Sequence, residues 1–368
     1  MKTDIAYSEA LEQAKANMDD VKARGADAIG EDVLGMLLLC IGIGSLLTMP
    51  ISGAAASRFG CKRVLIPAGI LFAIMLLVLC NISNFALAIP SLLIFGAVMG
   101  CIDVVVNIQA VIVEKAAGRQ LMSGMHALWS VGGFVGAGLF GVWVGIIGLT
   151  PLMSTVIAAL IMLAIISKYG TYLLPYGGEK SGKIFAIPRG IVTFVGIIAF
   201  IAFLVEGAIM DWSGVFLTTA RGFDLSLAGV GFSMFSAAML TMRLIGDKLI
   251  QAIGQKIVVF LGSIISFSGF MFLIFAESQV LLYSGFFLIG IGSANIVPIF
   301  FSLIGKQKVM PVNMAVPAVS TLAYAGILLG PSVIGFLAHQ TSLFAAFGFL
   351  AALVVLQLLI ASYIFNKF

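Results

Sequence analysis

Residues 53–63 read Gly53-Ala-Ala-Ala-Ser-Arg-Phe-Gly60-Cys-Lys-Arg63, and they join two long apolar segments. This turn holds three cations and two glycines and is too short to fold by itself. A weaker copy in the second half reads Arg-Leu-Ile-Gly-Asp-Lys from Arg243 and continues as Gly-Gln-Lys from Gly254. Gly60 and Gly254 are 194 positions apart. A motif repeated at a fixed offset predicts an internal duplication, and we interpret the rest of the chain on that basis.

Composition places the segments around this turn in a membrane. The chain is 61% apolar and only 10% charged, whereas soluble domains carry about a quarter charged residues. Its mean hydropathy is +1.17. Unbroken apolar runs such as Leu71–Leu79 exclude a spanning β-barrel, whose strands alternate apolar and polar residues. We therefore expect an all-α membrane protein.

The predicted membrane spans are apolar segments of about 20 residues or more, the length that crosses a bilayer. Eleven segments qualify: 33–55, 64–82, 87–113, 124–147, 150–168, 190–217, 226–249, 256–276, 279–304, 311–338 and 341–366.

Other classes of protein fit the composition poorly. The net charge of +4 is spread over loops, so we expect no nucleic-acid partner. The four cysteines lack CxxC or metal-ligand spacing, so we expect no metal and no cofactor. We find no nucleophile–base pair, so we do not expect an enzyme. The first 32 residues have no apolar core, so we expect no cleavable signal peptide.

The distribution of Lys and Arg predicts the orientation. Fifteen of the 20 lie in one set of loops and the C-terminal tail: 56–63, 114–123, 168–189, 242–256 and 305–310. Cytoplasmic loops are rich in Lys and Arg, so this set and the C-terminus are predicted to be cytoplasmic. Eleven spans then place residues 1–32 outside.

The duplication predicts two halves of unequal helix number. Residues 33–168 hold five spans and 190–368 hold six, with a polar, flexible cytoplasmic linker at 169–189. An offset of 193 places residues 1–32 where the equivalent of span 190–217 is expected. Each charge at mid-membrane costs about 2.5–3.5 kcal/mol on insertion scales, so this polar segment is not expected to span. We predict a first half that lacks its first membrane helix.

Two such halves, a basic loop between them and a Gly-x6-Gly-x-Lys-Arg turn resemble the major facilitator superfamily. Five residues match the turn signature of that family: Gly53, Arg58, Gly60, Lys62 and Arg63. Ser57 stands where the family usually has Asp, and we expect Asp247 to supply part of that acidic role in the second copy.

More local motifs resemble a group of bacterial inner-membrane facilitators that is distantly similar to fucose permeases. These motifs are Met122–Gly133, Glu206–Ser213 and Asp103-x3-Asn107. The resemblance implies two pseudo-symmetric helical bundles in the bacterial inner (plasma) membrane. It also implies proton-coupled secondary transport of a small polar solute, sugar-like or another metabolite, by rocking of the two halves. Superfamily members are often monomers, and we expect the same here.

Three acids lie inside the predicted spans, where ionisable residues are costly and mark functional sites. We expect Asp103 or Glu206 to bind and release the coupling proton; the alternative is a structural hydrogen-bond network between the halves. Asp211 lies about 140° from Glu206 around the helix, so one wall is not expected to hold both squarely. Asp211 beside Trp212 could equally be an interfacial anchor.

Other polar residues in or beside the spans have two interpretations each. Asn107 and Asn295 could hydrogen-bond a polar solute or hold helices together. His126 begins a span, where it could carry a proton or form a helix-end hydrogen bond. Glycine-rich faces should let helices approach closely; they comprise Gly132, Gly133, Gly136, Gly138, Gly141, Gly326, Gly330 and Gly335.

The basic turn also has two interpretations. As a gate, Arg58 and Lys62 would pair with an acid or a helix C-terminus when the cytoplasmic side is closed. Otherwise its cations only set the topology. For the whole chain, the alternative to a transporter is a truncated, non-transporting remnant or a membrane solute receptor.

Overall fold

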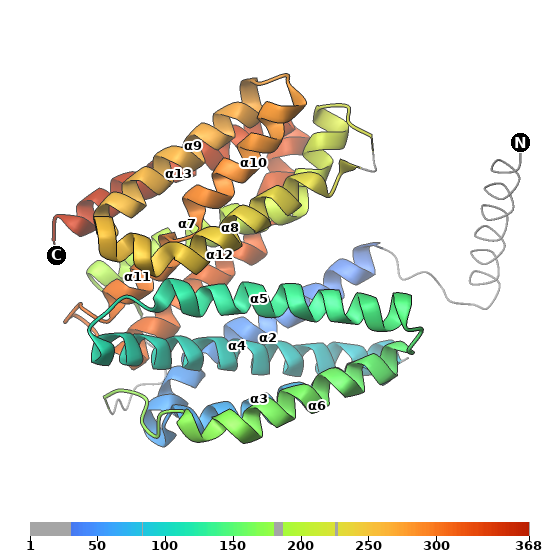
Figure 1. The fold of residues 1–368 in the computed structure, drawn as a ribbon, viewed down its shortest axis with the longest axis vertical. Coiled ribbons are helices and arrows are strands. Elements are labelled where there is room, and N and C mark those ends of the chain that lie inside the picture. Colours follow the sequence, from blue (N-terminus) through green and yellow to red (C-terminus); the bar gives the residue numbers. More distant parts are fainter. Residues whose placement is uncertain (1–30, 83, 180–186, 225–226, 368) are drawn as a thin grey trace, which may run out of the picture.

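The fold is all-helical and divides into two bundles, and the computed structural model describes residues 31–82, 84–179, 187–224 and 227–367 of it (Figure 1). The predicted polar segment 1–32 and the middle of the predicted linker therefore lie almost wholly outside the described residues. The first bundle contains α2 (Glu31–Phe59), α3 (Cys61–Asn81), α4 (Phe85–Ala117), α5 (Met122–Gly141) with a π-helical extension over Val142–Ile146, and α6 (Pro151–Tyr169).

The second bundle repeats this order with one more helix. Its elements are α7 (Ile191–Val215) with a π-helical extension over Phe216–Ala220, α8 (Val230–Ile253), α9 (Gln255–Phe275), α10 (Gln279–Ser293), α11 (Ile296–Ile304), α12 (Val312–Gln340) and α13 (Leu343–Phe365). Because α10 and α11 form one interrupted span, the described part of the chain has five spans followed by six. The predicted fold class is thus confirmed.

Ten of these spans are long and apolar enough to cross a bilayer. The eleventh, α8, does not meet that standard, and it carries Arg243, Asp247 and Lys248. In a bilayer every backbone polar group needs an internal partner, which is why the apolar runs adopt helices rather than extended strands.

The two turns at the predicted repeat have the same backbone geometry. Gly60 has φ 86° and ψ 154°, and Gly254 has φ 85° and ψ 153°. Residues with a Cβ rarely adopt such angles, so both positions require glycine. The predicted loops 56–63 and 242–256 are wrong in extent, since α2 runs to Phe59 and α8 to Ile253. Arg58 lies in the last turn of α2, where a cation interacts favourably with the helix dipole, so its charge did not end that helix.

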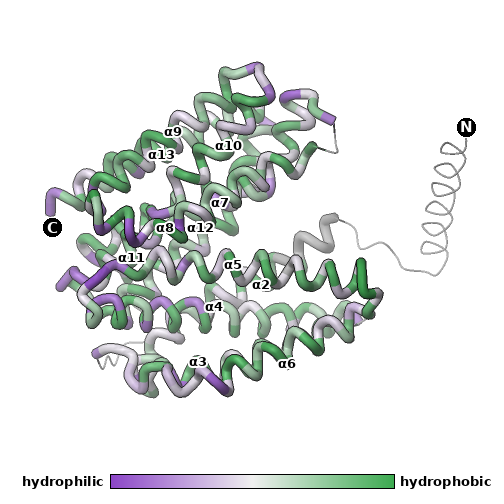
Figure 2. The backbone as a smooth tube through the Cα atoms, in the orientation of Figure 1, coloured by the Kyte–Doolittle hydropathy of each residue, from purple (hydrophilic) through white to green (hydrophobic). Residues whose placement is uncertain are grey.

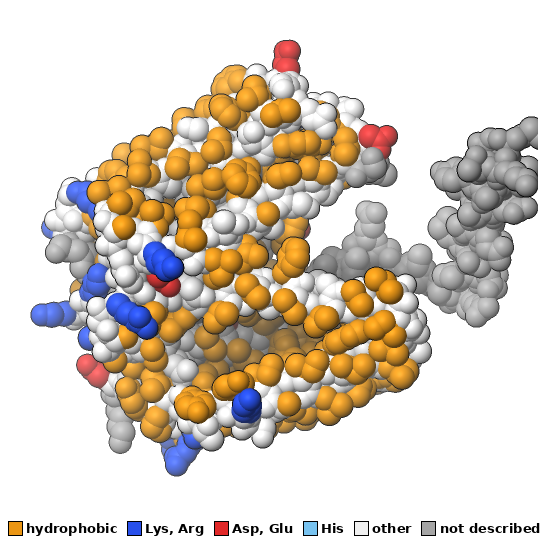
Figure 3. Space-filling view, viewed as in Figure 1, with side chains coloured by type: hydrophobic (Ala, Val, Ile, Leu, Met, Phe, Trp, Pro, Cys, Tyr) orange, Lys and Arg blue, Asp and Glu red, His pale blue; other side chains and the backbone are white. Residues whose placement is uncertain are grey.

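Lys and Arg gather at one end of the molecule. Figure 2 shows hydrophilic stretches at this end, where the turns after α2, α4 and α8 lie, and Figure 3 shows its cations. We call it the basic end; its cations include Arg58, Arg63, Lys115, Arg119, Lys256, Lys306 and Lys308. Figure 3 also shows a cleft between the two bundles, which opens at the opposite end. We call that end the open end.

Two helix pairs make the largest contacts between the bundles, α5 with α8 and α2 with α12. In the α2–α12 seam, the backbone of α2 lies directly against α12. A Cβ added at Gly53 would lie 2.3 Å from Pro317 Cγ and 2.4 Å from the Asn313 carbonyl oxygen. At Gly42 it would lie 2.3 Å from Leu328 Cδ2. Glycine is therefore required where these two helices cross.

The two predicted glycine faces differ. On α12, a Cβ at Gly326 would lie 2.2 Å from the Phe200 carbonyl oxygen of α7, and one at Gly330 would lie 2.8 Å from that of Leu204. On α5, a Cβ at Gly132, Gly133, Gly136, Gly138 or Gly141 would meet no atom of the described residues within 4 Å. The prediction of close helix approach is confirmed for α12 and does not hold for α5 among the described residues.

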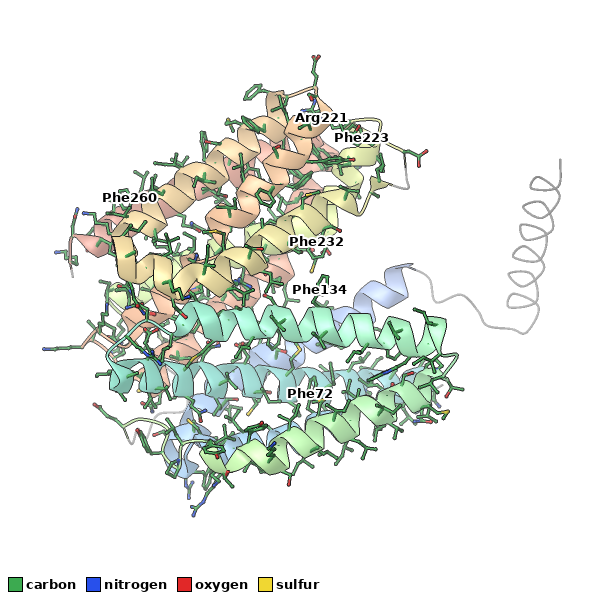
Figure 4. The ribbon with its side chains drawn as sticks, in the orientation of Figure 1. Phe72, Phe134, Arg221, Phe223, Phe232 and Phe260 are labelled. Carbon is green, nitrogen blue, oxygen red and sulfur yellow. The ribbon has the colours of Figure 1, made fainter. Side chains whose placement is uncertain are left out.

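At the open end, Arg221 holds three elements of the second bundle together (Figure 4). Its guanidinium lies 4.7 Å from the ring centroid of Phe344 and donates a 3.0 Å hydrogen bond to the Ile274 carbonyl oxygen. Burial lowers the pKa of Arg221, and the neighbouring Glu277 opposes that shift. These contacts tie the end of α7 to α9 and α13.

Candidate functional site

The centre of the site is Arg243, a buried cation on α8 that is 6% exposed. Its Nη2 lies 3.5 Å from Oε2 of Glu206 on α7. Its Nη1 donates a 3.1 Å hydrogen bond to Ser130 Oγ on α5, and its Nε donates a 3.2 Å hydrogen bond to the Ala294 carbonyl oxygen. One side chain therefore connects the two bundles and three elements of the second.

The carbonyl of Ala294 points at Arg243 because the span 279–304 is interrupted there. Ala294 and Asn295 separate α10 from α11. Non-helical backbone at membrane depth is tolerated where protein buries it or where it lines a cavity, and broken helices of this kind form solute sites in transporters. The interruption gives Arg243 an acceptor that a continuous helix would keep for itself.

Of the two predicted acids on α7, the structure brings only Glu206 to this site. Its side chain is 29% exposed beside the buried guanidinium. Asp211 is exposed, and its neighbour Trp212 donates a 3.0 Å hydrogen bond from Nε1 to the Pro331 carbonyl oxygen. The separation of the two acids follows from the turn of the helix.

Asp103 and Asn107 form a second polar group, on α4. Asn107 Nδ2 donates to Asp103 Oδ1 at 3.3 Å and to the Asp103 carbonyl oxygen at 3.0 Å. Tyr324 of α12 interacts electrostatically with Asp103 and lies against Phe203 of α7, with ring centroids 6.2 Å apart. This carboxyl group therefore faces the second bundle from the first.

His126 lies near the N-terminus of α5. Its Nδ1 donates a 3.0 Å hydrogen bond to the Met122 carbonyl oxygen, one turn earlier in α5. It interacts electrostatically with Arg243, and its ring is 5.8 Å from that of Phe301 on α11. The predicted helix-end hydrogen bond is thus present, in addition to a charged neighbour.

The N-terminus of α5 is capped by two carboxylates from different bundles. Glu114 Oε2 of α4 accepts hydrogen bonds from the N–H groups of Leu121 and Met122, both at 2.8 Å. Asp247 of α8 accepts from the N–H groups of Ser123 and Gly124, at 3.0 and 2.8 Å. We call these four hydrogen bonds the α5 cap. It satisfies four backbone donors and joins the bundles at the basic end.

Asn295 lies close to Ser123 of this cap and is 3% exposed. Its Nδ2 donates a 3.2 Å hydrogen bond to the Met242 carbonyl oxygen. Neither its Oδ1 nor the buried Ser123 Oγ has a hydrogen-bond partner among the described residues. Both side chains lie against Gly246: a Cβ added there would lie 2.1 Å from Asn295 Oδ1 and 2.8 Å from Ser123 Cβ.

The predicted gating residues of the first copy lie in a structured turn. The Lys62 N–H donates to the Leu174 carbonyl oxygen at 2.8 Å, and Lys62 Nζ lies 3.4 Å from the carbonyl oxygen of Thr171, just after α6. Arg58 lies against its neighbour Phe59, 5.3 Å from the ring centroid. The described first part of the linker is therefore bound to the turn rather than free, and Lys62 is at a helix C-terminus of its own bundle.

Ser57 occupies the position equivalent to an acidic residue and does not act as Asp247 does. Its Oγ donates a 2.8 Å hydrogen bond to the Glu179 carbonyl oxygen in the linker. At the basic end, the Asp247 carboxylate therefore joins α8 to α5, whereas the Ser57 hydroxyl joins α2 to the linker.

Sequence reasoning missed Arg243 and Glu114 as site residues. Arg243 falls in a charge-rich stretch that resembles a cytoplasmic loop, and Glu114 falls beside Lys115 at a predicted span end. One signal for Glu114 was present: at an offset of 193 it corresponds to Gln307. The Oε1 of Gln307 likewise accepts two consecutive backbone N–H groups, those of Val309 and Met310, at 2.7 and 2.9 Å.

Comparison with known proteins gives a family match and close relatives. The model of the Major Facilitator Superfamily matches residues 24–308. An uncharacterised MFS-type transporter from Yersinia pestis is 45% identical over 335 residues, which cover 90% of this chain and 87% of the relative.

Solved structures with the same fold include two transporters. The human organic anion transporter MFSD10 has a TM-score of 0.72 at 18% identity, over 97% of this chain and 91% of its own. FucP in its outward conformation, also a transporter of this superfamily, has a TM-score of 0.73 at 15% identity, over 95% of this chain and 94% of its own.

Proposed function

The chain belongs to the Major Facilitator Superfamily, and we propose that it is a proton-coupled secondary transporter that moves a small polar solute by alternating access. Membership of this family makes the protein a multi-pass membrane transporter. The observation that carries the rest is the ion pair of Arg243 and Glu206, whose guanidinium is buried and whose carboxylate is 29% exposed.

The proposed cycle uses the two ends of the molecule in turn. The α5 cap closes the basic end in this structure, while Figure 3 shows the cleft open at the other end. Figure 4 shows Phe134 on α5 and Phe232 on α8, the two helices of this seam; Phe134 lies one helical turn past Ser130, away from the α5 cap. Breaking the α5 cap and closing these helices together would expose the site to the basic end.

The proposed orientation places the basic end and the C-terminus in the cytoplasm of a bacterium, with the chain in the plasma membrane. The support is the positive-inside rule applied to the Lys and Arg of that end. The cleft then faces outward, the solute enters from outside, and the chain acts as a monomer. Arg58 and Lys62 remain proposed gating residues, alongside Gly53, Gly60, Arg63 and Asp247.

Glu206 and Asp103 are the proposed proton carriers, with Asn107 and Asn295 as polar contacts for the solute. A carboxyl group between two bundles can exchange its proton when the bundles separate. His126 is a further candidate because its ring interacts with Arg243.

Solute-driven proton uptake in proteoliposomes tests this proposal. A pH-sensitive dye is enclosed in the vesicles, and sugars, polyols and small carboxylates are added outside one at a time. We expect at least one solute to acidify the interior, and Glu206→Gln or Asp103→Asn to abolish that signal. A solute that binds the protein but neither enters nor carries protons would instead favour a solute receptor. Absence of both binding and uptake over the panel would count against the proposal.

A further inference from the structure

Arg243 carries more hydrogen-bonding capacity than its partners use. A guanidinium has five N–H donors in a planar fork that matches a carboxylate. Two of them bond Ser130 Oγ and the Ala294 carbonyl oxygen. The Nη2–Oε2 distance to Glu206 is 3.5 Å, longer than the roughly 2.7–2.9 Å of a charge-assisted hydrogen bond. The two groups attract each other electrostatically, but they do not form a short charge-assisted hydrogen bond.

Glu206 is also the more accessible member of the pair. Its side chain is 29% exposed, whereas that of Arg243 is 7% exposed. A ligand therefore reaches Glu206 first, with the nearly covered guanidinium directly beside it. The partners of Arg243 on the buried side are the neutral oxygens of Ser130 and Ala294, and they cannot balance its charge.

The surrounding elements offer no second fixed charge to the pair among the described residues. On α5 the titratable neighbour is His126, and on α8 the next acid is Asp247, which binds two backbone N–H groups of α5. On α4 Asp103 is paired with Asn107 and faces Tyr324 of α12. Between α10 and α11 lies Asn295, which is neutral.

Charge balance then restricts what can bind. The pair is neutral when Glu206 is ionised, so a neutral solute gains little from Arg243. An anionic solute would put two carboxylates on one buried cation, and an uncompensated buried charge is strongly unfavourable. One proton on Glu206 removes the excess charge and leaves the guanidinium fork to the solute.

We propose that Arg243 binds the carboxylate of a small anionic solute, and that Glu206 takes up one proton from the medium each time this happens. The proton moves to a Glu206 carboxylate oxygen, and no other bond forms or breaks. The complex carries the same charge as the empty site, so each monovalent anion would move with one proton. The transport half of this inference rests on the proposed function, whereas the binding half does not.

The test measures binding and proton uptake by the purified chain in lipid nanodiscs. The probes are monocarboxylates from acetate to gluconate, each paired with its neutral amide. Binding is followed as a rise in the midpoint of thermal unfolding, and proton uptake is followed with a pH dye in weakly buffered solution. Glu206→Gln mimics the protonated acid, and Glu277→Gln, an exposed carboxylate outside the site, is the matched control.

The double variant Arg243→Gln with Glu206→Gln removes both charges, so it leaves no unpaired buried ion and should fold. We expect at least one carboxylate to bind with uptake of one proton per molecule, and its amide not to bind. Glu206→Gln should bind the same carboxylate without proton uptake. The double variant should bind it at least about tenfold more weakly, a loss of roughly 1.4 kcal/mol. Glu277→Gln should behave as wild type.

Several results would overturn the inference: no carboxylate binds, amides bind as well as carboxylates, or the double variant binds as tightly as wild type. Proton uptake that persists in Glu206→Gln would remove the role of Glu206. Carboxylate binding in nanodiscs without accumulation in proteoliposomes would contradict transport and leave this site in place. Accumulation of a neutral sugar that survives the double variant would support transport and contradict the carboxylate site.

Discussion

The α5–α8 and α2–α12 seams between the bundles are equivalent by the internal repeat, yet one is held by charged and hydrogen-bonding groups and the other by close packing at glycines. The α5–α8 seam carries a carboxylate cap, a buried arginine and its Glu206 partner. The α2–α12 seam carries glycines in contact with Pro317 and the Asn313 backbone. Close packing does not depend on protonation or on a ligand, whereas ion pairs and charge-assisted hydrogen bonds do. We therefore interpret α5–α8 as the seam that changes during the cycle and α2–α12 as the seam about which it turns.

The largest expected effect is at Arg243 of the α5–α8 seam and its partner Glu206. Arg243→Ala leaves Glu206 without its cation and should cost about 3–5 kcal/mol of stability. Thermal unfolding in detergent should show this as a large fall in the midpoint. The double change to glutamine at both positions should recover much of the loss. Equal losses in the single and double variants would mean that the pair is not coupled.

A smaller effect is expected at the α5 cap. Asp247→Ala removes both acceptors of the Ser123 and Gly124 N–H groups, and at this partly exposed position each hydrogen bond contributes roughly 1–1.5 kcal/mol. We expect the first turn of α5 to exchange its amide hydrogens about 30–150-fold faster, which corresponds to a combined loss of about 2–3 kcal/mol. Asp247→Asn keeps one acceptor oxygen and should have an intermediate effect. Unchanged exchange in both variants would contradict the role of the cap.

The α2–α12 seam should respond to volume instead of charge. Gly53→Ala places a methyl group against Pro317 and the Asn313 backbone, and overpacking of this kind costs typically about 1–3 kcal/mol. Gly132→Ala on α5 is the matched control, because a Cβ there meets no described atom within 4 Å. The midpoint of thermal unfolding should fall for Gly53→Ala and stay unchanged for Gly132→Ala. A similar fall in both would show that the contrast in packing is not real.

The smallest effect tests whether the seams can be made alike. Ser57→Asp restores the acidic residue usual in the family at the turn, one helical turn beyond Gly53 and towards the N-terminus of α12. A carboxylate near a helix N-terminus contributes about 0.3–1 kcal/mol, so amide exchange in the first turn of α12 should slow about two- to fivefold. Ser57→Asn lacks the charge and should change little. Faster exchange in Ser57→Asp would contradict the proposed equivalence of the seams.

Much of the fold could be predicted from the sequence because hydropathy and repeat spacing are properties of the chain alone. The spans follow from apolar length, and Gly60 and Gly254 follow from the need for a positive φ at both turns. Helix ends were less accurate, because charges that seemed to end α8 are accepted inside it by tertiary partners. The interruption at Asn295 has one sequence signal that the prediction did not use: Pro298 lacks the N–H that would bond the Ala294 carbonyl oxygen.

The site was predicted only in part, since it depends on which helices meet. Glu206, Asp103 and Asp247 could be found because an acid within or beside a span is unusual wherever it lies. Arg243 could not be distinguished from the cations that set topology until its contact with Glu206 was known. The two glycine faces had the same pattern, yet only that of α12 is covered by another described helix.

The central claim is that the two ends of the α5–α8 seam open alternately. Spin labels at Arg119 and Lys248 report on the basic end, and labels at Phe134 and Phe232 report on the open end. Both distances are measured by pulsed electron resonance in nanodiscs, for wild type and for Asp247→Ala. The account predicts that losing the cap lengthens the first distance and shortens the second in the same molecules. A longer distance at the basic end with no change at the open end would mean local fraying and would contradict alternating access.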